Sequence, residues 1–354
     1  MEIVAEELSA RMASLGHEVT CYNRRGQHVS GKEFNTQVVQ EHRGVRLKTV
    51  WTMDRKGLAA VTASISAAVC SAFSRADVVH IHAEGPAFMC WLPKLLGKKV
   101  VVTIHGLDWQ REKWKGGFGA KYIRAGEKMA VRFADEIIVL SRNLQRYFYN
   151  TYRRETAWIP NGVQRPKRVP STAIKEKYGL ERDAYFLFLG RLVPEKGVHY
   201  LIEAFRNVDT DRKLVLAGAA SDTQEYVEKI KKMAAEDPRI LFTGFVQGEG
   251  LASLFSNAYA FVLPSDVEGM PLSLLEAMSY GNCCVVSDIS ECVEVVEEKA
   301  EVFPKGDVAA LSACIQRLCN DPALVKEYKD SAADYICGKY DWDKVTEETL
   351  RLYQ

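Results

Sequence analysis

The chain has 354 residues, a length that suits two domains of about 150 residues each rather than one small domain. Its composition is ordinary for a globular protein, with 47% hydrophobic and 26% charged residues. No apolar stretch is long enough to span a membrane, and the acidic N-terminus does not resemble a secretory signal. Nine scattered cysteines without a CxxC pair indicate reduced thiols rather than a zinc site or a disulfide framework. These features predict a cytoplasmic protein.

Short apolar strands alternate with amphipathic helices along the first half of the chain. Their near-continuous Val and Ile content is typical of strands that are buried on both faces of a parallel sheet. We expect strands at 18–23, 44–50, 77–82, 99–105 and 135–141, and helices at 2–14, 57–74, 86–96, 117–133 and 142–150.

The second half repeats this alternation after a Pro-, Gly- and Arg-rich stretch at 159–170, which predicts a linker near a domain boundary. Expected strands lie at 184–190, 212–218, 239–242, 259–263, 283–287 and 300–303. Expected helices lie at 172–178, 196–206, 221–236, 249–256, 271–280, 307–319, 322–338 and 341–353. Two such series predict two doubly wound α/β domains that face each other and bind ligands at the carboxyl ends of their strands.

Charge is divided unevenly between the two halves. Residues 1–168 contain 27 Lys and Arg against 15 Asp and Glu, a net charge of +12, whereas 169–354 contain 20 against 31, a net charge of −11. The basic half could bind anionic lipid headgroups or a phosphate-bearing substrate, or be an ordinary solvated surface. The positive charge of the first half would also be compatible with nucleic-acid binding. No nucleic-acid-binding motif is present, however, so we do not expect a nucleic acid as a partner.

One candidate site is the sequence GRLVPEKG at 190–197, which follows a predicted strand and precedes a helix. Arg191 and Lys196 would lie at the helix N-terminus, where cations, free backbone N–H groups and the helix dipole together suit a pyrophosphate. The alternative is a surface loop whose basic side chains are solvated.

A second candidate is the sequence EGMPLSLLE at 268–276, which follows the strand before it in the same way. Glu268 precedes the predicted helix, and Glu276 lies about one turn inside it. The two carboxylates could accept hydrogen bonds from the hydroxyls of one sugar-containing ligand. In isolation, such a pair is better explained by helix-dipole compensation and a solvated glutamate.

Taken together, these motifs resemble the retaining glycosyltransferases of family 4, which have the GT-B fold. The resemblance spans nearly the whole chain and includes GHEVTCYNR at 16–24, VVTIHGLD at 101–108, IPNGV at 159–163 and FVLPSDVEGMPLSLLEAMSYG at 261–281. The branch it most resembles makes bacterial surface polysaccharides. The resemblance implies an N-terminal acceptor-side domain (1–163, with a crossover helix at 340–354) and a C-terminal donor domain (164–339).

The resemblance also implies a role for each matching residue. Arg191 and Lys196 would neutralise the donor diphosphate, Glu276 would bind the ribose, and Glu268 and His105 would contact the donor sugar. Further donor contacts would come from Gly190, Gly244, Phe245, Val246, Gly269, Met270, Pro271 and Leu272, although Pro271 has no N–H to donate. The donor would be a nucleotide-diphosphate sugar, the acceptor a saccharide or lipid-linked saccharide, and no metal or other cofactor would be required.

The match departs from the family at its start, because a first strand and a Gly-rich loop usually precede the helix expected at 2–14. Without that central strand, its neighbours would lose their pairing, and we expect lower donor turnover than in an N-terminally extended version. Two other functions remain open: a degenerate binding module without turnover, and a sugar-nucleotide epimerase of the same fold.

Two basic, aromatic segments, 111–124 and 142–155, are candidates for contact with the acceptor or with an anionic membrane. The alternative for each is an ordinary loop and helix. If such contact occurs, the protein would be peripheral at the inner face of the membrane.

Overall fold

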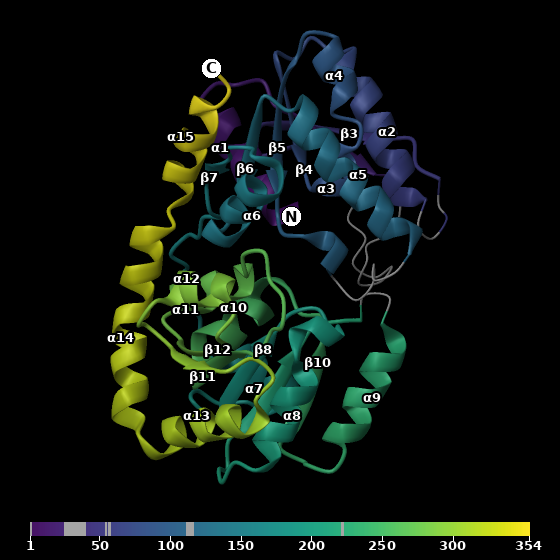
Figure 1. Cartoon of the computed structure of the whole chain (residues 1–354). Helices are drawn as coiled ribbons and strands as arrows, with labels where there is room; N and C mark the ends of the chain where they lie inside the picture. Colours follow the sequence, from purple (N-terminus) through teal and green to yellow (C-terminus); the bar gives the residue numbers. More distant parts are fainter. Residues whose placement is uncertain (1, 25–39, 54, 56–57, 111–116, 221–222) are drawn as a thin grey trace. The chain divides into compact units, whose positions relative to one another are not determined.

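The computed structural model describes residues 2–24, 40–53, 55, 58–110, 117–220 and 223–354. The chain forms two compact units, each described here by itself: unit 1 is Met1–Gly162 with Trp342–Gln354, and unit 2 is Val163–Asp341. Figure 1 shows both, coloured along the sequence.

Unit 1 contains seven strands and seven α-helices among its described residues. The strands are β1 (Thr20–Arg24), β2 (Glu41–His42), β3 (Val45–Val50), β4 (Val78–His82), β5 (Lys99–Ile104), β6 (Glu136–Val139) and β7 (Ala157–Trp158). The helices are α1 (Glu2–Ser14), α2 (Ala59–Ala72), α3 (Glu84–Ala87), α4 (Trp91–Leu95), α5 (Phe118–Phe133), α6 (Arg142–Tyr152) and α15 (Trp342–Arg351).

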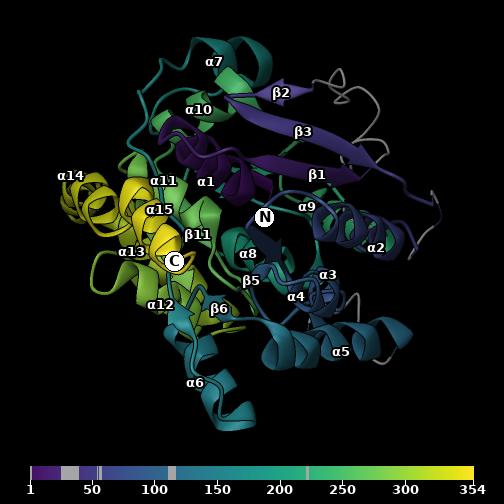
Figure 2. The same ribbon diagram turned by 90° about the horizontal axis from the view of Figure 1, so that it is seen from above.

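The described strands of unit 1 form two sheets rather than one. The first has the order β1-β3-β2, and the second is the parallel sheet β4-β5-β6-β7. Figure 2 shows β1 and β3 apart from β5 and β6. Within the described residues, β1 pairs only with β3 and β4 only with β5, so the two sheets are not joined by hydrogen bonds. The core of the second sheet includes Val100, Val102 and Ile137, all fully buried.

The sequence predicted one helix over 86–96, and this prediction was wrong. The structure has two short helices, α3 and α4, separated by a turn at 88–90. Pro93 explains the break because it has no N–H to bond to the Met89 carbonyl. That carbonyl accepts instead from Leu92 N at 3.1 Å. The short strands β2 and β7 were not predicted either.

Unit 2 is a doubly wound α/β structure with one six-stranded parallel sheet. Its strand order is β10-β9-β8-β11-β12-β13. The strands are β8 (Tyr185–Leu189), β9 (Lys213–Ala217), β10 (Ile240–Gly244), β11 (Ala260–Leu263), β12 (Cys283–Ser287) and β13 (Glu301–Phe303). The helices are α7 (Thr172–Tyr178), α8 (Val198–Arg206), α9 (Gln224–Ala234), α10 (Gly248–Asn257), α11 (Leu272–Ser279), α12 (Ser290–Val296), α13 (Val308–Asn320) and α14 (Pro322–Lys339).

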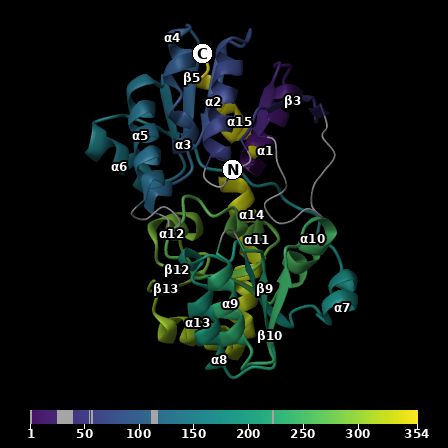
Figure 3. The ribbon, with the colours of Figure 1, turned by 90° about the vertical axis from the view of Figure 1, so that its right-hand side faces the viewer.

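Helices cover the sheet of unit 2 in two groups. Helix α8 packs against α9 and α13, whereas α11 packs against α14 (Figure 3). Because both faces are covered, the central strands are buried along nearly their whole length, as their apolar composition predicted. Helix α12 was not predicted.

The chain returns to unit 1 through α15, which packs against α1. Trp342, at the start of α15, lies against Gly162, where a Cβ would come within 2.5 Å of the indole ring. None of the nine cysteines forms a disulfide, and only Cys70 is exposed. No helix in the described part of the chain has both the length and the apolar composition needed to cross a bilayer.

Candidate active site

The strand order of unit 2 places two predicted loops next to each other. Chain connections run from β8 outward to β9 and β10, and then return to β11 on the other side of β8. The loops after β8 and β11 therefore leave the sheet in opposite directions at its carboxyl edge. This switch point is where doubly wound sheets bind ligands. The two loops are residues 190–197, which are the first candidate motif, and 264–271, which contain the start of the second.

The first loop is held close to its neighbours by two glycines with positive φ. Gly218 has φ +149°, and a Cβ there would lie 1.8 Å from the carbonyl oxygen of Gly190. Gly197 has φ +66°, and a Cβ there would lie 2.0 Å from the carbonyl oxygen of Pro264. Both positions therefore require glycine, for conformation and for space. Gly197 joins the 190–197 loop to the loop after β11.

Lys196 and Glu268, both predicted site residues, form an ion pair across the switch point. Lys196 Nζ donates to Glu268 Oε1, and Ser265 Oγ donates to the same oxygen at 2.7 Å. The two side chains are only 13% and 8% exposed. The pair is thus largely shielded from water, and it places a cation and a carboxylate side by side at the switch point. Ser265 was not predicted, because a lone serine after a strand carries no distinctive signal.

Glu276 lies on α11, beyond the loop that contains Glu268. Burial raises the pKa of Glu276 from its ordinary value of 4.5 to about 7. Helix α11 begins at Leu272, and Pro271 is its N-cap residue rather than part of its first turn as predicted. Gly269, Met270 and Pro271 are buried beside the start of this helix.

Arg191 and the predicted donor-contact residues Gly190, Gly244, Phe245 and Val246 lie at the same carboxyl edge of the sheet. Arg191 is exposed in the loop after β8. The Gly244 carbonyl accepts from Gly218 N at 2.9 Å, and Gly190 N donates to Ala217 O at 3.1 Å. These bonds connect the loops after β8, β9 and β10. Phe245 and Val246 follow Gly244 and are partly buried. The structure therefore gathers the predicted residues of unit 2 along one sheet edge.

A second polar network in the same region was missed from the sequence. Asp266 N donates to Glu195 O at 2.8 Å, and Tyr200 OH donates to Asp266 Oδ2 at 3.4 Å. Burial raises the pKa of Asp266. Asp266 thus links the loop after β11 to α8, and the only sequence signal was its place within PSDVEG.

His105, the predicted site residue of unit 1, belongs to a row of histidines at the carboxyl ends of β4 and β5. His82 Nδ1 and His105 Nε2 lie 3.0 Å apart, one donating and the other accepting. His80 stacks on His82 with ring centroids 4.4 Å apart and bonds to Thr103 and Tyr353. Burial lowers the pKa of His82 to about 4. His82 is therefore neutral near pH 7, and it orients the ring of His105.

A buried pair of carboxyl groups supports the loop that follows His105. Glu84 and Glu127 are both fully buried. Burial is the main cause that raises the pKa of Glu84 well above its ordinary value, and the neighbouring carboxyl of Glu127 adds to this shift. Glu84 Oε2 accepts from Asp108 N at 2.8 Å, and Glu127 Oε2 accepts from Trp109 Nε1 at 3.1 Å. The pair thus fixes the 3-10 turn at 108–110. It was not predicted, because Glu84 and Glu127 lie far apart in the sequence.

Of the two segments predicted to contact the acceptor or a membrane, the structure describes 142–155 completely and 111–124 only in part. In α6, Tyr147 and Tyr152 donate to Glu127, and Phe148 is fully buried. These three aromatic side chains point inward, whereas Tyr149 on the same helix is 48% exposed, so membrane contact through 142–155 stays a prediction. Residues 111–116 lie outside the described part of the chain.

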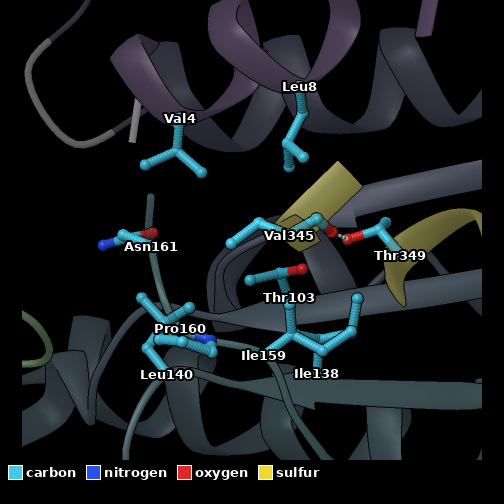
Figure 4. A pocket seen from close by; sticks show the side chains of 10 residues that line it. All are labelled: Val4, Leu8, Thr103, Ile138, Leu140, Ile159, Pro160, Asn161, Val345 and Thr349. Carbon is cyan, nitrogen blue, oxygen red and sulfur yellow. Dashed lines mark hydrogen bonds between the residues drawn. The ribbon is translucent and has the colours of Figure 1, made fainter. Parts of the chain in front are cut away.

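A small pocket in unit 1 is lined by residues of α1, β5, β6 and α15 and of the segment 159–161 after β7 (Figure 4). Its lining is mainly apolar, and its space is sufficient for roughly one water molecule, which is too little for a sugar or nucleotide. The described residues also contain no group of three or more His, Cys, Asp or Glu positioned to hold a metal ion.

Fold and site together define an α/β protein whose second unit carries a cation and carboxylates at its switch point. The family patterns "Glycosyltransferase Family 4" and "Glycosyl transferases group 1" match residues 1–165 and 170–335. The uncharacterised glycosyltransferase YqgM of Bacillus subtilis is 30% identical over 290 residues, which cover 79% of this chain and 78% of YqgM.

Solved structures show the same fold. Sucrose-phosphate synthase from Thermosynechococcus elongatus superposes with a TM-score of 0.82 at 21% identity, covering 99% of this chain and 92% of that one. Anabaena HepE in complex with UDP-glucose superposes with a TM-score of 0.75 at 18% identity, covering 87% and 86%. This chain belongs to the family 4 glycosyltransferases of the GT-B fold, as the motifs predicted.

Proposed function

We propose that this protein transfers a sugar from a nucleoside-diphosphate sugar to a saccharide or lipid-linked saccharide, with retention of anomeric configuration. The observation that carries the proposal is the Lys196–Glu268 pair at the switch point of unit 2. Anabaena HepE, of the same fold, has been solved with UDP-glucose and with UDP and glucose, which supports a nucleotide sugar as donor.

In the proposed reaction, the bond between the anomeric carbon and the diphosphate breaks, and a bond from the acceptor hydroxyl oxygen forms on the same face. The departing phosphate oxygen takes the acceptor's proton. Lys196 and Arg191 stabilise the negative charge that develops on the diphosphate. Because these cations supply the charge, the reaction is proposed to need no metal, so chelation with EDTA should leave the rate unchanged.

The two glutamates have different proposed roles. Glu268, which accepts from Lys196, exchanges part of this contact for the donor sugar as the phosphate approaches the lysine. Glu276 accepts hydrogen bonds from the nucleotide ribose. His105 contributes a sugar contact from unit 1, with its ring oriented by His82.

A mutant series tests these roles. A thermal-shift screen with UDP-, GDP- and dTDP-sugars first identifies the donor. We expect Glu276→Ala to weaken donor binding about tenfold or more, the equivalent of one or two lost hydrogen bonds. We expect Glu268→Ala mainly to lower kcat. Glu228→Ala, at an exposed position on α9, is the matched control.

The product's anomeric configuration, read by NMR coupling constants, tests retention. Unchanged transfer kinetics in both glutamate mutants would refute the proposed site. Donor binding without turnover across an acceptor panel would favour the degenerate module, and epimerised free nucleotide sugar would favour the epimerase.

A further inference from the structure

Helix α2 has an unusual surface for a helix that faces solvent. Its 14 residues include no Asp, Glu, Lys or Arg. Leu58, Ile65, Val69 and Phe73, spaced seven, four and four residues apart, lie on one face of the helical path and are 44%, 39%, 41% and 74% exposed. On a helix that faces solvent, the outer face normally carries charged or polar side chains. The exposed apolar face of α2 is therefore a candidate binding surface.

Helix α4 extends this apolar surface. It packs against α2 (Figures 1 and 3), and its last residue, Leu95, and the C-cap residue Leu96 are 68% and 45% exposed. Lys98 Nζ donates to Ser74 O at 2.8 Å and so joins the segment after α4 to the end of α2. We call Leu58, Ile65, Val69, Phe73, Leu95 and Leu96 the α2–α4 ridge. Apolar side chains gathered in this way, rather than scattered singly, mark an interaction surface.

Charges near the ridge are mostly positive. Arg75 follows α2, and Lys94, Lys98 and Lys99 lie on or after α4, whereas Asp77 is the exposed carboxylate in this stretch. Lys94 is paired with Asp135. Exposed leucine and phenylalanine bordered by lysine and arginine complement an anionic bilayer, whose acyl region accepts the apolar groups while its headgroups attract the cations. Two copies of the chain would instead bring like charges together.

We propose that the α2–α4 ridge docks unit 1 onto an anionic membrane surface. This surface is distinct from the two segments suggested by the sequence, and it consists of described, exposed apolar side chains. Docking would place the protein where a lipid-linked acceptor is available. That choice of acceptor rests on the proposed function, whereas docking itself does not and can be measured without donor or acceptor.

Vesicle co-sedimentation of the whole chain tests the proposal. We expect binding to phosphatidylcholine vesicles that contain phosphatidylglycerol, weaker binding to pure phosphatidylcholine, and release at high salt. Leu95→Glu and Phe73→Glu should each reduce binding about tenfold or more, because each removes one inserted side chain. Leu15→Glu is the matched control: Leu15 is 61% exposed in unit 1 but lies after α1. Circular dichroism verifies that all variants fold.

Insertion has a second readout at Cys70, the exposed cysteine of α2. A polarity-sensitive fluorophore on this thiol should shift to the blue with anionic vesicles. Absence of vesicle binding would overturn the proposal, as would equal loss of binding in Leu15→Glu and Leu95→Glu. Concentration-dependent dimers that Phe73→Glu abolishes, without vesicle binding, would assign the ridge to a second copy of the chain. Lack of transfer activity with vesicle binding intact would count against the proposed function alone.

Discussion

Burial of the Glu276 carboxyl makes pH a probe of the donor site. With a pKa of about 7, this group is partly protonated in the ligand-free protein near neutrality. A carboxylate accepts hydrogen bonds from two hydroxyls better than a neutral carboxyl does, so donor binding should favour the deprotonated form. Donor affinity should therefore rise roughly tenfold from pH 6 to pH 8. Titration calorimetry should show this rise in the wild type and its loss in Glu276→Gln.

The same shifted pKa affects stability with a defined sign. The native state holds the proton of Glu276 more tightly than the unfolded chain, whose ordinary value is 4.5. The contribution of this group to folding is therefore most favourable below pH 4.5 and is lost as pH rises toward 7, by on the order of 3 kcal/mol. Glu276→Gln should thus be more stable than the wild type at pH 8 but not at pH 5. A wild type more stable than the mutant at pH 8 would contradict the assigned burial.

The contact between the two site loops depends on Gly197. Replacement by alanine would place a Cβ 2.0 Å from the Pro264 carbonyl oxygen and strain a backbone with φ +66°. We expect Gly197→Ala to destabilise unit 2 by about 3 kcal/mol or more and to reduce donor affinity. Gly248, at φ +60° with nothing within 4 Å of an added Cβ, is the matched control. Gly248→Ala should cost only about 1 kcal/mol.

Comparing the free energies of unfolding of the two glycine mutants by chemical denaturation separates the cost of backbone strain from the cost of the steric clash between the added Cβ and the Pro264 carbonyl. Similar free energies of unfolding for Gly197→Ala and Gly248→Ala would show that the loops are not held by this close approach.

At the level of elements, the sequence predicted the features that depend on local pattern. Runs of Val, Ile and Phe identified the buried parallel strands. The motifs after β8 and β11 lie in adjacent loops because neighbouring parallel strands end at the same edge of the sheet. Contacts between distant segments were not predictable in this way. The Glu84–Glu127 pair joins α3 to α5, and Ser265 joins Glu268 through the folded geometry of a loop. Helix α12 and strand β7 are too short for a clear periodic signal.

At the scale of the whole molecule, the chain crosses from unit 1 to unit 2 and returns through α15. Because the return helix packs against α1 and Trp342 lies against Gly162, the end of the chain contributes to the stability of its first part. The side chain of Trp342 is almost fully buried. The donor-site residues Lys196, Glu268 and Glu276 all belong to unit 2.

This division predicts that the two units can be perturbed separately. Trp342→Ala should destabilise unit 1 by about 3–5 kcal/mol, as expected for truncation of a buried tryptophan. The affinity of unit 2 for its nucleotide sugar should stay unchanged, since the indole belongs to unit 1. Glu348→Ala, at an exposed position on the same helix, should alter neither property. Calorimetry should show the transition of unit 1 lowered in Trp342→Ala, and the donor should raise mainly the transition of unit 2. If the donor raised both transitions equally, the units would unfold as one cooperative body, and their separate treatment would be wrong.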